Sequence, residues 1–263
     1  MRNFLAFVLL GTSLVACVRR GDDTESAESA LDSADSVDTE GNLMMATMDG
    51  ADMAATGLTA DDVATRIAAN VANRWQPTGC ATVDQQGSSI TITYNDCTGP
   101  RGLIHVSGQL VLTVQVKLDG TISVHGTSGD LTANDAHLVV DVDATYASTG
   151  TGHTLTVSTS GSATGPRGFE LEHTGDYTIT WDTTSQCRSL AGSWATELTR
   201  TDGTTAQRST QANMMRCAGG CPVGTVSRTF ATGTMLTVTF DGTSTAQWET
   251  STGRSGTITL QCP

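Results

Sequence analysis

The stretch LVLTVQVKL, residues 110–118, decides the fold class of this chain. Apolar side chains occupy every second position, at 110, 112, 114, 116 and 118, and Thr113, Gln115 and Lys117 alternate with them. A period of two is typical of a β-strand that buries one face and wets the other. Asp119-Gly120 follows directly and predicts a hairpin turn. The stretch therefore predicts a long strand of an antiparallel sheet.

The same alternation recurs from Cys80 to the end of the sequence. Further apolar faces are formed by Ile90, Ile92 and Tyr94, by Leu138, Val140 and Val142, by Leu155 and Val157, by Tyr177, Ile179 and Trp181, by Leu236, Val238 and Phe240, and by Ile258 and Leu260. Turn signals separate them at Asp119-Gly120, Gly150, Asp202-Gly203, Gly233 and Asp241-Gly242. We predict an all-β fold, a large curved antiparallel meander that is sandwich-like or barrel-like.

One helix is predicted before the strands. Thr59 is placed to cap it, and Asp62 stands at the capping-box position. An apolar stripe follows at steps of four, formed by Val63, Ile67, Val71 and Trp75, and Pro77 and Gly79 end it. We expect this stripe to pack on the sheet, so that residues 58–263 form one helix plus the β-domain.

Residues 1–17 have the layout of a secretory signal peptide: Arg2, an apolar run from Phe4 to Leu10, and small residues before Cys17. Leu14-Val15-Ala16-Cys17 resembles the lipobox of bacterial lipoproteins, a family in which the cysteine is acylated, with palmitate among its acyl groups, and becomes the new N-terminus. The resemblance implies that residues 1–16 are removed and that lipid on Cys17 anchors the protein to a membrane. Val18 after the cysteine resembles the pattern of lipoproteins sent to the outer membrane. An ordinary signal peptide cut elsewhere and a transmembrane helix are the alternatives, although the run is short for spanning a bilayer.

Residues 17–57 are predicted to be a disordered acidic tether, since they hold too little apolar surface to offset the entropy of ordering. The whole chain has a formal net charge of −13, which disfavours nucleic acid as a partner. Lys117 is its one lysine, so no polybasic patch attracts anionic lipid. The expected partners are the membrane, through the lipid on Cys17, and an unknown envelope protein or glycan.

Seven cysteines become an even set once Cys17 is assigned to the lipid. An even set in an oxidising compartment predicts disulfides. The midpoint between each of three cysteine pairs falls on or beside a turn signal, as cross-strand bridging of a hairpin requires. The predicted pairs are Cys80–Cys97, Cys187–Cys217 and Cys221–Cys262, and an alternative pairs Cys221 with Cys187.

A short repeat predicts three related hairpins. TGPRG occurs at 98–102 and again at 164–168, and TGRSG at 252–256 is a weaker copy. Similar strands, 87–94, 152–159 and 233–240, precede the three copies. Arg101 and Arg167 would project from the first two turns. A solvated arginine on a well-formed turn is the preferred interpretation, and a binding site formed by both arginines is the alternative.

The sequence contains no G-x-S-x-G, H-E-x-x-H, P-loop or G-x-G-x-x-G motif, so no catalytic residue, metal or cofactor is assigned. A transition-metal site would require two or three of the five histidines, at 105, 125, 137, 153 and 173, to converge. A calcium site would draw on Asp130, Asp135, Asp141 and Asp143. Asp141 and Asp143 share one strand face and make half of such a site, but a solvated charged face is the preferred interpretation.

Two features of the strands suggest binding surfaces. Paired threonines such as Thr91 and Thr93 resemble the arrays of ice-binding β-proteins, which need a flat face, and irregular spacing argues against that role. Trp248 is the best candidate for an exposed, sugar-binding aromatic. We expect a non-enzymatic envelope lipoprotein with a binding or structural role. The alternatives are a hydrolase acting on envelope polymer and a calcium-binding or metal-binding β-domain.

Overall fold

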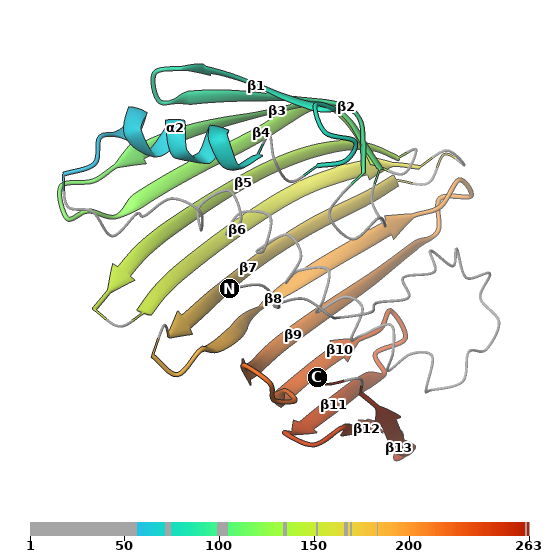
Figure 1. Cartoon of the computed structure of the whole chain (residues 1–263). Coiled ribbons are helices and arrows are strands. Elements are labelled where there is room, and N and C mark those ends of the chain that lie inside the picture. Colours follow the sequence, from blue (N-terminus) through green and yellow to red (C-terminus); the bar gives the residue numbers. More distant parts are fainter. Residues whose placement is uncertain are drawn as a thin grey trace.

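Thirteen strands form one antiparallel sheet in which each strand pairs with its neighbours in sequence (Figure 1). The computed structural model describes residues 57–71, 75–98, 105–133, 136–150, 152–165, 168, 170–182, 184–260 and 262. The strands are β1 (Ala81–Gln86), β2 (Ser89–Thr98), β3 (His105–Val116), β4 (Ile122–Ala133), β5 (Ala136–Thr149), β6 (Gly152–Thr164), β7 (Glu170–Asp182), β8 (Cys187–Thr199), β9 (Thr205–Cys217), β10 (Val223–Thr229), β11 (Met235–Asp241), β12 (Thr245–Thr250) and β13 (Ser255–Thr259). The all-β meander predicted from the alternation is confirmed.

The five turn signals all fall between strands, and three of them are the same tripeptide. Asp-Gly-Thr occupies 119–121, 202–204 and 241–243, with φ of 82°, 80° and 87° at the glycines. A positive φ is a conformation that glycine adopts without steric cost. The aspartate accepts a hydrogen bond from the threonine amide, at 2.9 Å in the turn at Asp202. Hydrogen bonds from the Thr204 hydroxyl and amide hold the pKa of the Asp202 carboxyl below its ordinary value.

The predicted helix is present as α2 (Ala60–Val71), and its cap has the predicted form. The Asp62 amide donates to the Thr59 hydroxyl at 3.2 Å, and the Thr59 amide donates to the Asp62 carboxylate at 2.9 Å. The hydrogen bonds from the Thr59 hydroxyl and amide lower the pKa of Asp62. These reciprocal bonds satisfy amides that the helix itself leaves free.

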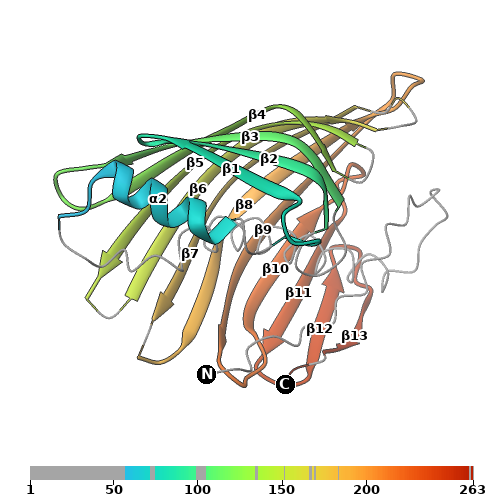
Figure 2. The ribbon, with the colours of Figure 1, turned by 45° about the horizontal axis from the view of Figure 1, so that its top comes forward.

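The sheet curves strongly, and α2 lies against its inner side (Figure 2). Open sheets of this size curl because every strand is twisted. The inner face is the apolar face of every strand, and its side chains form one core cluster with Val63, Ile67 and Val71 of α2. The opposite, outer face carries most of the polar residues, although Val139, Met215 and Met235 are exposed there and Arg228 is buried on the inner face. The prediction that Trp75 ends the helical stripe was wrong, because Trp75 is not helical; its ring still packs edge-on against Tyr94, with ring centroids 4.9 Å apart.

Aromatic residues of the inner face lie opposite glycines. Five cross-strand pairs join an aromatic residue to a glycine: Tyr94 with Gly108, Trp194 with Gly175, Tyr177 with Gly192, Phe240 with Gly224, and Trp248 with Gly256. At Gly256 the absent side chain leaves the space that the Trp248 ring occupies, since a Cβ there would lie 2.7 Å from the ring. At Gly108, Gly192 and Gly224 an added Cβ would instead meet the backbone of a neighbouring strand, so glycine permits close approach of the strands there.

Three disulfides join the pairs that hairpin symmetry predicts. They link Cys80 to Cys97, Cys187 to Cys217, and Cys221 to Cys262. Cys187 and Cys217 are direct cross-strand partners of β8 and β9. The alternative pairing of Cys221 with Cys187 is therefore not the one adopted.

Two further expectations about individual elements were wrong. β3 ends at Val116, and Leu118 is a fully exposed residue of the following turn rather than a member of the apolar face. The third copy of the repeat forms the turn between β12 and β13, so the strand before it is β12 and not residues 233–240. The reason is that the Asp241-Gly242 turn inserts another hairpin between that strand and the copy.

The described residues contain no helix with the length and apolar character needed to cross a bilayer. The predicted signal peptide and tether, including Cys17, lie outside the described residues, except for Gly57. Arg101, Arg167 and Asp135 lie outside them as well.

Candidate functional site

A single in-register row of polar residues crosses the outer face of all thirteen strands. From β1 to β13 it consists of Gln86, Ser89, Thr113, His125, Asp143, Ser158, Asp176, Ser193, Gln211, Ser227, Thr237, Glu249 and Ser255. We call it the polar row. None of its members is buried. Three strand pairs, β2–β3, β3–β4 and β4–β5, each contain one shift in register. Each shift lies towards the opposite end of these strands from the polar row, so the row stays continuous.

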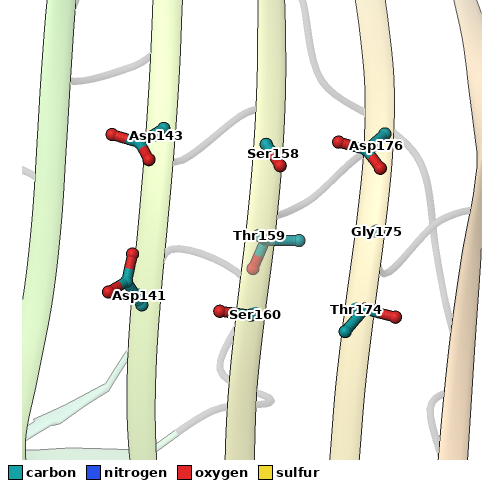
Figure 3. A pocket seen from close by; sticks show the side chains of 8 residues that line it. All are labelled: Asp141, Asp143, Ser158, Thr159, Ser160, Thr174, Gly175 and Asp176. Atoms are coloured by element: carbon teal, nitrogen blue, oxygen red, sulfur yellow. The ribbon is translucent and has the colours of Figure 1, made fainter.

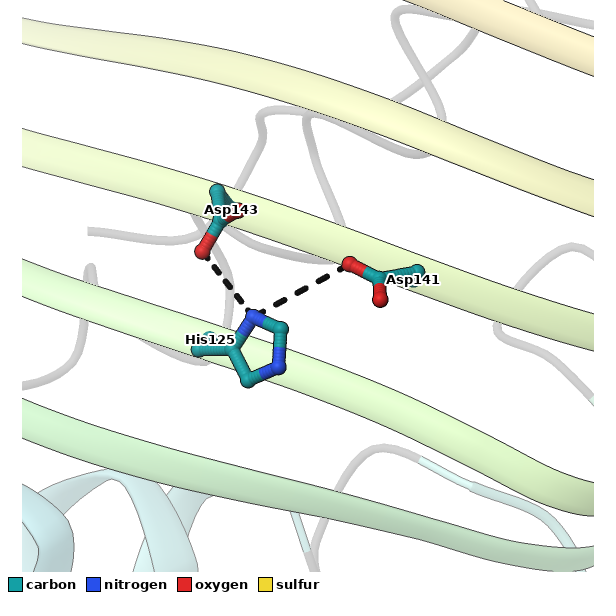
Figure 4. A group of neighbouring side chains, drawn as sticks. All are labelled: His125, Asp141 and Asp143. Atoms are coloured by element: carbon teal, nitrogen blue, oxygen red, sulfur yellow. Dashed lines mark hydrogen bonds and ion pairs between the residues drawn. The ribbon is translucent and has the colours of Figure 1, made fainter.

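A group of three possible metal-ligating side chains lies on this row where β4 and β5 are adjacent (Figure 4). His125 Nδ1 is 2.9 Å from an Asp143 carboxylate oxygen and 3.9 Å from an Asp141 carboxylate oxygen. Asp143 is the direct cross-strand partner of His125, and Asp141 is two residues earlier on the same face of β5. All three side chains are exposed, with 48% to 70% of their surface accessible.

The strand pairing extends this group towards β7. Asp143 is opposite Ser158, and Ser158 is opposite Asp176, so two carboxylates flank one hydroxyl (Figure 3). Asp141 is opposite Ser160, which is opposite Thr174. These side chains line a shallow hollow on the outer face, and a second hollow on the other side of Asp143 is lined by Thr113, Gln115, Ser123, His125 and Asp143.

The five histidines do not gather in one place. His105 contacts the Thr98 hydroxyl, and His137 lies 3.9 Å from an Asp130 carboxylate oxygen. His153 Nδ1 is 2.6 Å from the Tyr146 hydroxyl, and His173 contacts the Thr196 hydroxyl on the inner face. Partial burial lowers the pKa of His173 below its ordinary value. The described part of the chain therefore does not bring two or three histidines together, as a transition-metal site built from several histidines would require.

The structure adds His125 to the half-site formed by Asp141 and Asp143, which residue spacing along the sequence does not predict. The alternation of β5 places both carboxylates on one face, as predicted, but His125 comes from β4. Its proximity depends on the register of β4 against β5, in which the pairing shifts between Thr127 and Leu131. Period-two alternation alone does not give cross-strand register.

Trp248 is buried, with 6% of its surface accessible, and so is not an exposed sugar-binding aromatic. Ala246, Trp248 and Thr250 alternate as buried residues of β12, whereas Gln247 and Glu249 are exposed. The sequence itself indicates burial, because Trp248 is two positions after Ala246 and therefore lies on the same face of the strand. Its position near the third copy of the repeat was the misleading feature.

The paired threonines line up across the strands only in part, and the face that carries them is not flat. A second outer row contains Thr145, Thr156, Thr178, Thr225 and Thr239, but Ala191 and Asn213 interrupt it, and Thr91 lies opposite Val111. The curvature of the sheet separates this surface from a planar threonine array (Figure 2).

The His125–Asp143 pair has one element of a catalytic relay, an imidazole oriented by a carboxylate. Among the described residues, no hydrogen bond joins the His125 ring to a serine or threonine hydroxyl. The group also lies on an open strand face. Its chemistry is that of one nitrogen and several oxygen donors presented to solvent. No family model, no curated protein and no solved structure matches this chain.

Proposed function

We propose that this protein is a membrane-anchored envelope lipoprotein with a non-enzymatic binding role, and that the outer face of the sheet is its binding surface. The observation that carries the proposal is the polar row, in which hydroxyl, amide, carboxylate and imidazole groups continue across thirteen strands. A polar face needs no such continuity merely to remain solvated. An extended polar partner, such as an envelope glycan or protein, would find donors and acceptors at each strand.

Two features support export and anchoring. Three disulfides are characteristic of a protein that folds in an oxidising compartment. They use six cysteines and leave Cys17, which stands at the end of the lipobox-like segment. Acylation of Cys17 would account for the remaining thiol. Several acyl chains would give a stable anchor, since one chain holds only weakly.

The exposure of the candidate site supports a binding rather than a catalytic role. Enzyme active sites gain from excluding water, because electrostatic stabilisation is stronger there. The imidazole and carboxylates of this site are instead about half exposed or more. Such groups are suited to reversible contacts with a partner.

Anchoring is tested by labelling cells with a palmitate analogue and separating membranes from soluble proteins. We expect label and membrane association for the natural chain, and loss of both for Cys17→Ser. Protease shaving of intact cells then reports the side of the membrane: release of tether peptides from residues 18–56 places the domain outside. An unlabelled natural chain in the soluble fraction would reject the anchor.

Binding is tested with a photo-cross-linking amino acid placed at Ser193 in the polar row. The matched control places it at Thr232, an exposed residue of the turn between β10 and β11. We expect a discrete cross-linked species from Ser193 in intact cells, and none from Thr232. Equal products from both positions, or none from Ser193, would contradict binding through the outer face. This result does not depend on the lipid, so anchoring and binding are tested separately.

A further inference from the structure

We propose that His125, Asp141 and Asp143 bind a divalent first-row transition cation, for which zinc is the reference ion. The three side chains each offer one ligand atom, and these atoms lie within 4.8 Å of one another. They come from adjacent strands, so the paired backbone of β4 and β5 holds them in place. One imidazole nitrogen and two carboxylate oxygens form a mixed nitrogen and oxygen donor set of the kind that transition metals accept.

The separations are close to those of ligands on a single ion. Zinc lies about 2.0–2.2 Å from nitrogen and oxygen ligands, so two ligands of one tetrahedral ion are about 3.3–3.6 Å apart. His125 Nδ1 is 2.9 Å and 3.9 Å from the nearest oxygens of Asp143 and Asp141, one on each side of this spacing. All three side chains are exposed, so small rotations of the carboxylates can bring the three ligand atoms to a common ion.

The charge of the surroundings favours a cation. The hollow beside the group is lined by Asp141, Asp143 and Asp176 together with hydroxyls of Ser158, Ser160 and Thr174. Neither this hollow nor the adjoining one that contains His125 has a lysine or arginine among its lining residues. Three carboxylates therefore lie together without a basic side chain in the lining to balance them. A bound divalent ion would reduce their mutual repulsion.

The nitrogen donor distinguishes this site from other acidic pairs of the same face. Glu172 and Glu197 are cross-strand partners, yet no imidazole accompanies them in any three-ligand group of the described residues. His137 has one nearby carboxylate, Asp130, which is 95% exposed. Calcium and magnesium take oxygen ligands, whereas imidazole suits zinc, copper and nickel. The triad on β4 and β5 therefore selects a transition cation.

Three protein ligands leave at least one coordination position open. In zinc proteins such a position holds water or an incoming ligand. On the exposed outer face, it would accept an anionic group of a partner. The metal would then add a directional contact within the polar row.

The test is calorimetric titration of zinc into the whole, disulfide-intact chain, stripped of metal and held at about pH 7.5 because imidazole binds metal only when neutral. We expect one zinc per chain. His125→Ala and Asp143→Asn should each weaken binding at least about tenfold. His137→Ala is the matched control, because it removes an exposed histidine of the same face beside one carboxylate, and it should bind as the natural chain does.

These residues are exposed on the outer face, so we expect the variants to fold, and urea unfolding of each variant checks this. Cobalt provides a second readout, since its visible spectrum should change with His125→Ala and not with His137→Ala. Absence of zinc binding by the folded natural chain would overturn the proposal. So would binding that His125→Ala leaves unchanged, or calcium binding without zinc binding. Because purified protein is used, the outcome is independent of anchoring in the cell.

Discussion

At the scale of the residue, glycines determine how this chain uses its few large side chains. Phe, Trp and Tyr make up 5% of the sequence, so few large rings are available to fill the core. A Cβ added to Gly256 would lie 2.7 Å from the Trp248 ring, whereas one added to Gly192 would meet the backbone of β7, with the Asp176 carbonyl oxygen at 2.4 Å. Gly256 is therefore a packing residue, and the Trp248 ring and this glycine act as a unit.

Gly256→Ala tests this dependence. We expect a loss of about 1–3 kcal/mol in the free energy of unfolding, because the Trp248 ring must move from its packed position. In a Trp248→Ala background the same change should cost much less, giving a coupling of about 0.5–3 kcal/mol. Urea unfolding of the four proteins measures both quantities. Additive effects would show that ring and glycine contribute independently.

At the scale of the element, α2 is held by packing as well as by its cap. Val63, Ala64 and Ile67 are completely buried against the sheet. The Gln85 side chain donates to the Thr65 hydroxyl at 3.1 Å, which joins the polar side of the helix to β1. A helix of 12 residues is marginal alone, so tertiary contacts supply most of its stability. Its role is to cover the inner face near β1–β3.

Truncation of Ile67 should reveal that role. Ile67→Ala is expected to cost about 2–5 kcal/mol of unfolding free energy, since it leaves a cavity between α2 and the sheet. Ile67→Val, which removes one methylene group, should cost only about 0.5–1.5 kcal/mol. Chemical denaturation measures the series. A negligible effect of Ile67→Ala would mean that the sheet is stable without the helix.

At the scale of the whole molecule, disulfides fix the two ends of a sheet that is built from local hairpins. Cys80–Cys97 lies at the β1–β2 end, and Cys221–Cys262 spans 41 residues and encloses the last strands. The strands that it encloses, β10 to β13, are short, with five to seven residues each. Short strands with an exposed edge have few ladder contacts, so a covalent link there restrains the sheet where it is weakest.

Removal of this link is expected to destabilise the protein. The double variant Cys221→Ala/Cys262→Ala should lose about 2–4 kcal/mol, because the unfolded chain regains the entropy of the open loop. The double substitution avoids a free thiol that would mispair. Thermal and urea unfolding measure the loss, and hydrogen exchange in β10–β13 should rise most. Unchanged stability and exchange would contradict a restraining role.

Local rules account for what the sequence by itself determined. Alternation from Leu110 to Val116, the Asp-Gly turns and the Thr59–Asp62 cap each depend on residues a few positions apart, and hairpin symmetry extends this to the cysteine pairs. Leu118 and Trp248 show the limits of such rules. Leu118 continues the alternating pattern although its strand ends at Val116. Trp248 was predicted to be exposed because it is near the third copy of the repeat, although its alternation with the exposed Gln247 and Glu249 indicates the buried face.

Only the tertiary structure decided which residues lie side by side on different strands. The polar row and the approach of His125 to Asp141 and Asp143 depend on the register of β4 against β5, where a bulge shifts the pairing between Thr127 and Leu131. A shift by one residue would place His125 on the other face. Alternation specifies the face of a side chain, whereas turns, bulges and curvature set its neighbours. For that reason the fold followed from the sequence, and the candidate site did not.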